Sequence, residues 1–277
     1  MNCSSCWNRA EMTGQLQEIA AIIAGAKRLV AFTGSGISAE SGIPTFRDPG
    51  GLWDRYDPEL MRNAEYAATM PLKGAARDFL QEMLATLEGA EPNPGHLALA
   101  ELERMGILRS VLTQNIDNLH TEAGNTTVIE VHGNFYRMRC LSCGRTFKLK
   151  RGAELRLMMQ RLIESGEGET IRLADMMPRC QCGGLTRFDV VHFGEPVQDF
   201  DRAEEQARSC DVMLALGTSG VVTPAAFLPG YAKGSGAKVI EVNATGSCFA
   251  GISDYSIMAK TGEALPQIVS KVKEILG

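Results

Sequence analysis

Two polar clusters in this sequence carry side chains that could bind and activate a small ligand. Asn115 and Asp117 come directly after the short apolar run 110–113, and His132 follows the run 128–131. An imidazole titrates near neutral pH and can act as a general base, while amide and carboxyl groups orient polar ligands. A turn-forming role would explain either cluster alone. Because the carboxyl ends of parallel strands meet at one edge of a sheet, the two together predict a ligand-binding cleft.

A glycine-rich turn near the N-terminus supplies a third candidate. The apolar run 29–32 leads into Gly34-x-Gly36-x-x-Ala39, a permissive form of the turn that binds a pyrophosphate at the start of a helix. An ordinary turn after a buried strand is the alternative. A dehydrogenase needs an acidic residue about 20 positions further on, at the end of a second strand, but Asp54, which stands at that distance, lies in a Gly-rich, aromatic stretch and is expected in a loop. The loop instead continues into 44–47, whose aromatic ring and cation could cover a ligand.

Cysteine spacing predicts a metal site within 136–187, a segment that interrupts the alternation of strands and helices. One pair has C-x-x-C spacing and the other the tighter C-x-C spacing. Four thiolates suit tetrahedral Zn²⁺, and a site without histidine is typical of a closed, structural centre; unpaired structural cysteines are the alternative. Cys210 and Cys248 are expected to be buried. The four candidate ligands are Cys140, Cys143, Cys180 and Cys182.

Composition fits a globular protein with one large core and a small appendage. The chain has 277 residues, of which 44% are hydrophobic and 22% charged, and its formal net charge of −5 argues against a dedicated nucleic-acid binder. No apolar run reaches the roughly 20 residues of a membrane span, and the N-terminus lacks the features of a secretory signal. We expect a cytoplasmic protein. Cys3 and Cys6 have chelating spacing, but an inert tail is the favoured interpretation.

Alternating apolar runs and helical patterns predict an α/β fold with a doubly wound, Rossmann-like parallel sheet. The expected divisions are a flexible tail (1–12), a nucleotide-binding domain (13–135 and 188–277) and an inserted zinc module (136–187). A first helix is expected to start after an N-cap at Thr13. The expected strands are 29–32, 110–113, 128–131, 188–193, 212–216 and 238–242.

Taken in order, these motifs resemble the sirtuins, the family of NAD-dependent protein lysine deacylases. The resemblance runs from about residue 19 to 276. Its N-terminal block is Thr33-Gly34-Ser35-Gly36-Ile37-Ser38-x-x-Ser41-Gly42-Ile43-Pro44-x-Phe46-Arg47. The later blocks are Thr113-Gln114-Asn115-Ile116-Asp117-x-Leu119-His120, His132-Gly133, the two cysteine pairs, Phe193-Gly194-Glu195, Gly217-Thr218-Ser219-x-x-Val222-x-Pro224-Ala225 and Asn243.

This resemblance implies a reaction in which the bond between nicotinamide and ribose of NAD breaks and the acyl-lysine oxygen attacks C1′. The acyl group then ends on ADP-ribose. His132 would be the general base for a ribose hydroxyl, and Phe46 would shield C1′ from water. Asp117 and Ile116 would hold the nicotinamide carboxamide.

The resemblance also implies the remaining contacts. Gln114 and Asn115 would lie by the ribose, Asn115 also serving catalysis, and Ser38 and Arg47 by the ribose and phosphates, on a loop that includes Gly34, Ser35 and Gly36. Gly217, Thr218, Ser219 and Asn243 would hold the adenosine half. An acylated peptide would bind as an added strand between two segments, whose residues are Val191, Phe193, Gly194, Glu195, Val221 and Val222.

Three departures and three alternatives accompany this interpretation. Ser35 stands where the family usually has alanine, the C-x-C pair is unusual, and His192 lies beside the expected peptide strand. Leu80 and Met83 align with the Tyr and Arg that grip acidic acyl groups in desuccinylating members, so acetyl or longer aliphatic groups are favoured. The alternatives are mono-ADP-ribosyl transfer or NAD hydrolysis at the same site, an NAD-sensing scaffold, and lastly a dehydrogenase.

Overall fold

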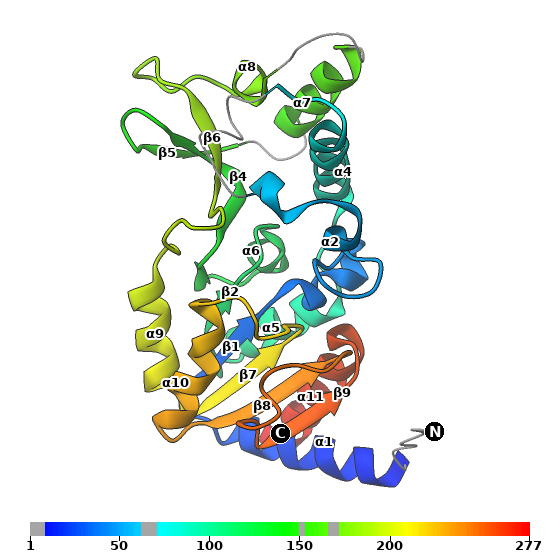
Figure 1. Cartoon of the computed structure of the whole chain (residues 1–277). Coiled ribbons are helices and arrows are strands. Elements are labelled where there is room, and N and C mark those ends of the chain that lie inside the picture. The colour runs from blue at the N-terminus through cyan, green and yellow to red at the C-terminus, as the bar shows by residue number, and fades with distance from the viewer. Residues whose placement is uncertain (1–8, 62–70, 150–152, 166–171) are drawn as a thin grey trace.

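The chain folds around a parallel sheet, which occupies the lower half of Figure 1, with a smaller antiparallel sheet above it. The computed structural model describes residues 9–61, 71–149, 153–165 and 172–277. The strand order of the larger sheet is β3-β2-β1-β7-β8-β9, and each neighbouring pair is parallel. These strands are β1 (Leu29–Thr33), β2 (Leu108–Thr113), β3 (Val128–Glu130), β7 (Val212–Leu216), β8 (Lys238–Asn243) and β9 (Tyr255–Met258).

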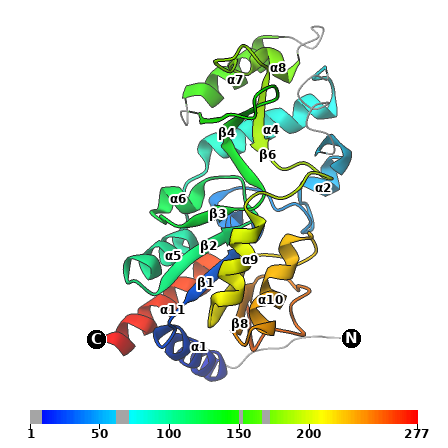
Figure 2. The ribbon, with the colours of Figure 1, turned by 90° about the vertical axis from the view of Figure 1, so that its left-hand side faces the viewer.

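Helices cover both faces of this sheet because its central strands present apolar side chains in both directions. In β1, Leu29 and Ala31 belong to one apolar cluster with α1, α5 and α11, whereas Val30 and Phe32 belong to another with α9 and α10. Figure 2 shows these two groups of helices on opposite sides of the strands. The predicted doubly wound sheet is therefore confirmed. The helices are α1 (Arg9–Ala24), α5 (Pro94–Arg104), α9 (Phe200–Ser209), α10 (Leu228–Gly234) and α11 (Thr261–Leu276).

The smaller sheet has the order β5-β4-β6 and packs with helices from two separate stretches of the chain. One apolar cluster joins side chains between Ile43 and Ala90 to side chains between Leu119 and Val190. The predicted boundaries of the zinc module, 136 and 187, stay a prediction. The elements of this part are β4 (Gly133–Cys140), β5 (Thr146–Lys148), β6 (Thr186–Val190), α2 (Leu52–Arg55), α4 (Ala75–Gly89), α6 (Leu119–Ala123), α7 (Ala153–Glu164) and α8 (Leu173–Met176).

The strand predicted at 188–193 as part of the parallel sheet was wrong in both extent and partner. Strand β6 ends at Val190 and pairs antiparallel with β4 in the smaller sheet. Its residues alternate: the Phe188 ring stacks on Phe135 with centroids 3.8 Å apart, while Asp189 binds two arginines. Such alternation is typical of an antiparallel strand, whereas a central parallel strand is apolar throughout.

Two predicted helix starts also differ. Helix α1 begins at Arg9 rather than after Thr13. The glycine-rich turn leads into two single 3₁₀ turns, η1 (Ser35–Ile37) and η2 (Ala39–Ser41), instead of a long helix. Two further 3₁₀ turns are η3 (Pro58–Met61) and η4 (Ala225–Phe227).

The remaining sequence predictions concern cysteines, an edge strand and the N-terminus. Cys210 is buried as expected, but Cys248 is exposed, because its loop lies outside the core beyond β8. Strand β9 was not predicted. Cys3 and Cys6, with most of the predicted tail, lie outside the described residues. Among the described helices, none combines the length and the apolar character that crossing a bilayer requires.

Candidate active site

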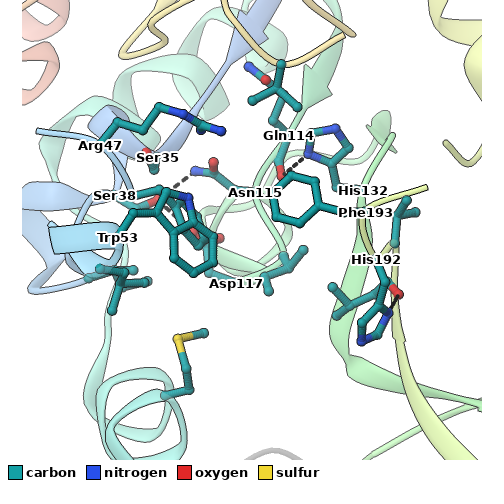
Figure 3. A pocket seen from close by; sticks show the side chains of 18 of the residues that line it. Ser35, Ser38, Arg47, Trp53, Gln114, Asn115, Asp117, His132, His192 and Phe193 are labelled. Atoms are coloured by element: carbon teal, nitrogen blue, oxygen red, sulfur yellow. Dashed lines mark hydrogen bonds between the residues drawn. The ribbon is translucent and has the colours of Figure 1, made fainter. Parts of the chain in front are cut away.

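A pocket with an empty volume of about 1060 Å³, including the part open to solvent, lies at the carboxyl edge of the parallel sheet beside the smaller sheet (Figure 3). Most of the predicted site residues meet here. Those lining the pocket are Ser35, Ser38, Phe46, Arg47, Gln114, Asn115, Ile116, Asp117, His132, Val191, Phe193, Gly194, Glu195 and Val222. The predicted residues outside its lining are Gly34, Gly36, Gly217, Thr218, Ser219, Val221 and Asn243.

His132 stands between β3 and β4, where the chain passes from the larger sheet to the smaller one. Its Nδ1 lies 3.0 Å from the backbone oxygen of Gln114. A carbonyl oxygen only accepts, so Nδ1 carries the proton of the neutral ring and Nε2 is left as a base. Burial lowers the pKa of His132, although the Gln114 carbonyl raises it. The ring is therefore unprotonated at neutral pH, as a general base must be.

No residue with a Cβ atom fits at the next position, Gly133. Its φ is +82°, and a Cβ atom there would lie 2.0 Å from the backbone oxygen of Asp189. The close approach of β4 to β6 directly after His132 thus requires glycine.

A buried hydroxyl group organises the polar end of the pocket. Ser38 Oγ donates to Asp117 Oδ2 at 2.6 Å and accepts from Asn115 Nδ2 at 2.9 Å. Asp117 Oδ1 accepts from the backbone N–H of Leu119 at 3.0 Å. Burial raises the pKa of Asp117, while the hydrogen bond from Ser38 lowers it. The hydroxyl therefore fixes the directions of both an amide and a carboxyl group.

Two histidines to which the sequence analysis gave no role in the site lie behind this group. His96 Nδ1 accepts from the Asn93 backbone N–H at 3.4 Å, and His96 Nε2 is 3.4 Å from Ser38 Oγ. Burial lowers the pKa of His96 to about 4. The neutral ring thus carries its proton on Nε2, which forces Ser38 to point its own proton at Asp117. The start of the α5 helix had been the only role predicted for His96, and the structure confirms that position.

His120 extends the same buried layer. Its Nε2 is 2.9 Å from Thr33 Oγ1, which donates to Thr113 Oγ1 at 2.8 Å. The rings of His96 and His120 meet edge to face with centroids 4.9 Å apart. Burial, then the neighbouring His96, lowers the pKa of His120 well below its usual value. Strands β1 and β2 therefore end in one connected set of neutral polar groups.

The glycine-rich turn packs against the loop after β7. Gly36 N–H donates to the Gly217 oxygen at 2.8 Å, and a Cβ atom on Gly36 would lie 2.7 Å from Gly217 Cα. Thr218 joins the neighbouring strand ends: its hydroxyl accepts from Gln114 Nε2 at 2.8 Å and its carbonyl from Asn243 Nδ2 at 3.0 Å. The predicted adenosine-binding residues therefore lie side by side at the same sheet edge, next to the pocket.

The loop after the glycine turn brings an aromatic and a cationic group to the pocket. The Phe46 and Trp53 rings have centroids 5.2 Å apart, and Trp53 lies 6.2 Å from Phe193 across the cleft. Burial lowers the pKa of the Arg47 guanidinium, which has no hydrogen bond or ion pair with any residue that the structure describes. A half-buried cation without a partner is suited to a phosphate.

The segment after β6 forms the opposite wall. Val191 N–H donates to the His132 backbone oxygen at 2.9 Å, so this wall is tied to the candidate base. Glu195 accepts from the His192 backbone N–H at 2.9 Å and from Arg187 at 3.0 Å. Phe193 lines the pocket and is 41% exposed, which leaves apolar surface at the pocket mouth.

The far end of the pocket is apolar and was largely missed from the sequence. Helix α4 contributes Met83 and Leu87, and α2 contributes Leu52 and Trp53. Leu80, which had been aligned with Met83 as an acyl-contacting pair, belongs to the buried cluster of the smaller sheet instead of the pocket lining. The helical spacing of α4 had predicted a core helix, and one face of it also serves the pocket.

The four predicted zinc ligands converge as a metal requires. Their Sγ atoms all lie within 4.8 Å of one another, with Cys140–Cys182, Cys143–Cys182 and Cys143–Cys180 separations of 3.6, 3.6 and 3.7 Å. Zn–S bonds of about 2.3 Å in a tetrahedron place sulfurs about 3.8 Å apart, so the set fits Zn²⁺. Backbone N–H groups of Cys143 and Ser142 point at Cys140 Sγ and lower the pKa of that thiol.

Fold and pocket together define a nucleotide-binding protein of the doubly wound class, with a partly buried histidine beside an amide–carboxyl cluster and an apolar far end of the pocket, the apolar channel. The model of the Sir2 family matches residues 34–224. A NAD-dependent protein deacylase of Desulfosudis oleivorans is 51% identical over 94% of this chain and 96% of its own length. The chain belongs to the Sir2 family, the sirtuins.

Solved structures of the family superpose on most of the chain. A Sir2 homologue in complex with NAD is 38% identical, with a TM-score of 0.78 over 94% of this chain and 95% of that one. Sir2Af2 bound to a myristoylated histone peptide is 35% identical, with a TM-score of 0.67 over 96% and 99% of the two chains. The predicted fold class and family are therefore confirmed.

Proposed function

We propose that this protein is an NAD-dependent protein lysine deacylase, which transfers the acyl group of a modified lysine to ADP-ribose and releases nicotinamide. The observation that carries the proposal is the meeting, in one pocket, of His132, the Ser38–Asn115–Asp117 cluster and an apolar channel. The relatives named above, a deacylase and complexes with NAD and with an acylated peptide, support it.

His132 is the general base in this proposal. Its Nδ1 proton is held by the Gln114 carbonyl, so Nε2 is free to take a proton from a ribose hydroxyl of NAD. Asp117 and Ile116 hold the nicotinamide carboxamide, and Asn115 holds the ribose side with Gln114. Phe46 covers the reacting carbon against water, so that the acyl oxygen is the nucleophile that reaches it.

The rest of the dinucleotide is assigned to the sheet edge. Arg47, a half-buried cation that no described residue pairs with, and Ser38 face the phosphates and ribose, together with the loop that holds Gly34, Ser35 and Gly36. The adenosine half lies on the loops joined through Thr218, which also contain Gly217, Ser219 and Asn243.

The acylated substrate occupies the cleft mouth and the apolar channel. An extended peptide pairs with the backbone of two segments, whose residues are Val191, Phe193, Gly194, Glu195, Val221 and Val222. Met83 and Leu87 offer no positive charge to an acidic acyl group. Acetyl and longer uncharged acyl groups are the substrates that this channel suits.

The cysteine cluster has a structural role, and the absence of disulfides among the described cysteines favours a cytoplasmic location. Cys140, Cys143, Cys180 and Cys182 would hold Zn²⁺, which ties the loops before β5 and before β6 together. None of the six described cysteines is in a disulfide, as is usual in reducing compartments.

Product analysis tests the proposal. The full chain with an acetyl-lysine peptide and NAD should yield deacetylated peptide, nicotinamide and acetyl-ADP-ribose in equal amounts by mass spectrometry. His132→Ala should abolish turnover, and Arg202→Ala, on an exposed face of α9, should not change it. Nicotinamide release at the same rate with and without the peptide would favour NAD hydrolysis. ADP-ribose attached to protein would favour mono-ADP-ribosyl transfer. NAD binding without turnover would favour the scaffold role.

A further inference from the structure

The apolar end of the pocket contains one residue that the proposed reaction does not use. His192 follows β6 and lines the same pocket as Leu52, Met83 and Leu87. Figure 3 shows its ring pointing away from His132 and Asp117. Only 9% of this residue is exposed. The imidazole thus shares this pocket with aliphatic and thioether side chains, and a buried polar group is costly unless it finds a partner.

The protein itself occupies one of the two ring nitrogens. Nδ1 of His192 lies 3.0 Å from the Val190 backbone oxygen and 3.2 Å from Arg187 Nη1. Glu195 fixes this arrangement by accepting from Arg187 and from the His192 backbone N–H. Nε2 has no hydrogen bond with any residue that the structure describes. It remains accessible to solvent, unlike the unpartnered ring nitrogen of His120. This nitrogen is therefore available to a ligand.

The ring is neutral, and in both of its tautomers Nε2 lacks a hydrogen-bond partner. Burial, then the neighbouring Arg187, lowers the pKa of His192. When Nδ1 donates to the Val190 oxygen, Nε2 is an acceptor; when Nδ1 accepts from Arg187, Nε2 is a donor. A hydroxyl group satisfies either tautomer. A carboxylate satisfies only the second, and a methylene group satisfies neither.

We propose that His192 makes this pocket prefer acyl groups that carry a hydroxyl on a short aliphatic chain over the unsubstituted chain of the same length. The inference rests on the deacylase function proposed above. Acidic acyl groups remain excluded, because the charge of Arg187 is taken up by Glu195, whose own carboxylate stands 3.6 Å from Nδ1.

Competing acyl peptides test this preference. The wild-type protein, His192→Phe and His192→Gln are each assayed with NAD on one peptide that carries butyryl or 2-, 3- or 4-hydroxybutyryl lysine. The quantity compared is the ratio of kcat/KM for the best hydroxybutyryl peptide to kcat/KM for the butyryl peptide. We expect a ratio above one for the wild-type protein and a ratio roughly 2- to 10-fold lower for His192→Phe, the worth of one hydrogen bond.

The other variants separate this effect from pocket shape. The glutamine amide can offer a donor and an acceptor near the position of Nε2, so His192→Gln should keep most of the ratio. Met83→Leu changes the pocket wall without changing its polarity and should alter both peptides alike. If His192→Phe fails to fold, His192→Leu replaces it with the same expectation.

Two results would overturn the inference. The first is a kcat/KM ratio that His192→Phe leaves unchanged, and the second is a ratio that Met83→Leu lowers as much as His192→Phe does. An absence of NAD-dependent turnover on an acetyl-lysine peptide refutes the deacylase function itself, and this inference with it.

Discussion

Replacing Ser38 by alanine tests whether its buried hydroxyl positions the carboxyl group of Asp117. Alanine removes the donor to Asp117 Oδ2 at 2.6 Å and the acceptor of Asn115 Nδ2 at 2.9 Å. Ser38 itself is 0% exposed. Each buried group left unpaired costs about 1–3 kcal/mol, and the longer bond from His96 Nε2 at 3.4 Å is lost as well, so the free energy of unfolding should fall by about 2–6 kcal/mol. The melting temperature should then fall by roughly 4–12 °C.

Activity should fall by more than stability explains. Asp117 keeps only the bond from the Leu119 backbone N–H to Oδ1, and its carboxyl group can turn away from the pocket. A misplacement of about 1 Å costs about 100-fold in rate. We therefore expect a fall of about 100-fold in kcat/KM for NAD in the acetyl-peptide assay, measured below the melting temperature of the variant.

Ser41→Ala is the matched control for this experiment. Ser41 Oγ accepts from Asn93 Nδ2 at 3.0 Å, but that amide keeps its stronger bond to the Ile37 oxygen at 2.7 Å. Stability and kcat/KM of this control should stay close to wild type. A Ser38→Ala protein with wild-type kcat/KM would refute the positioning argument, whatever its melting temperature.

Three further predictions use other parts of the structure. Because burial lowers the pKa of His132 and its unprotonated form acts as the base, kcat/KM should be flat near pH 7 and fall as pH drops below 6.5; an acid limb centred above that value contradicts the assignment. Cys143→Ser should release the bound zinc and lower the melting temperature, as measured by a zinc-sensitive dye and by calorimetry, and an unchanged zinc content of one per chain would rule the site out. Glu82 accepts from Arg55 at 2.7 and 2.8 Å and from Tyr56 at 2.8 Å, and so holds the segment beside the Phe46 loop. Glu82→Gln should therefore raise KM for NAD roughly 2- to 5-fold with little change in kcat. An unchanged KM would contradict this.

The cluster of candidate catalytic residues could be predicted from the sequence because its members follow strands directly. Asn115, Asp117 and His132 each stand within a few residues of a buried strand end, and parallel pairing of β1, β2 and β3 brings them to one edge. The zinc ligands could be predicted for a similar reason, since their spacing is local. The first prediction needed the chain order and one rule of sheet topology, and the second needed the spacing within each cysteine pair.

The apolar channel could not be predicted this way. It lies where α2, α4 and the segment after β6 meet, and Leu52, Met83 and Val190 are far apart in the chain. Each has an ordinary explanation as a core residue, because the periodicity of a helix reports which face is apolar and not whether that face meets a ligand or another side chain. Only the packing of the two parts of the protein decides this.

The layer of His96 and His120 shows a different limit. His96 is 58 residues from its partner Ser38, and His120 is 87 residues from its partner Thr33. His96 has no neighbour in sequence that suggests a role, and His120, although it ends the block that contains Asp117, received no role of its own. Their contribution is the direction of a proton: His96 donates to Ser38, and Ser38 can then only donate to Asp117. His96, which does not line the pocket, therefore helps to set the orientation of the Asp117 carboxyl group through Ser38, which does.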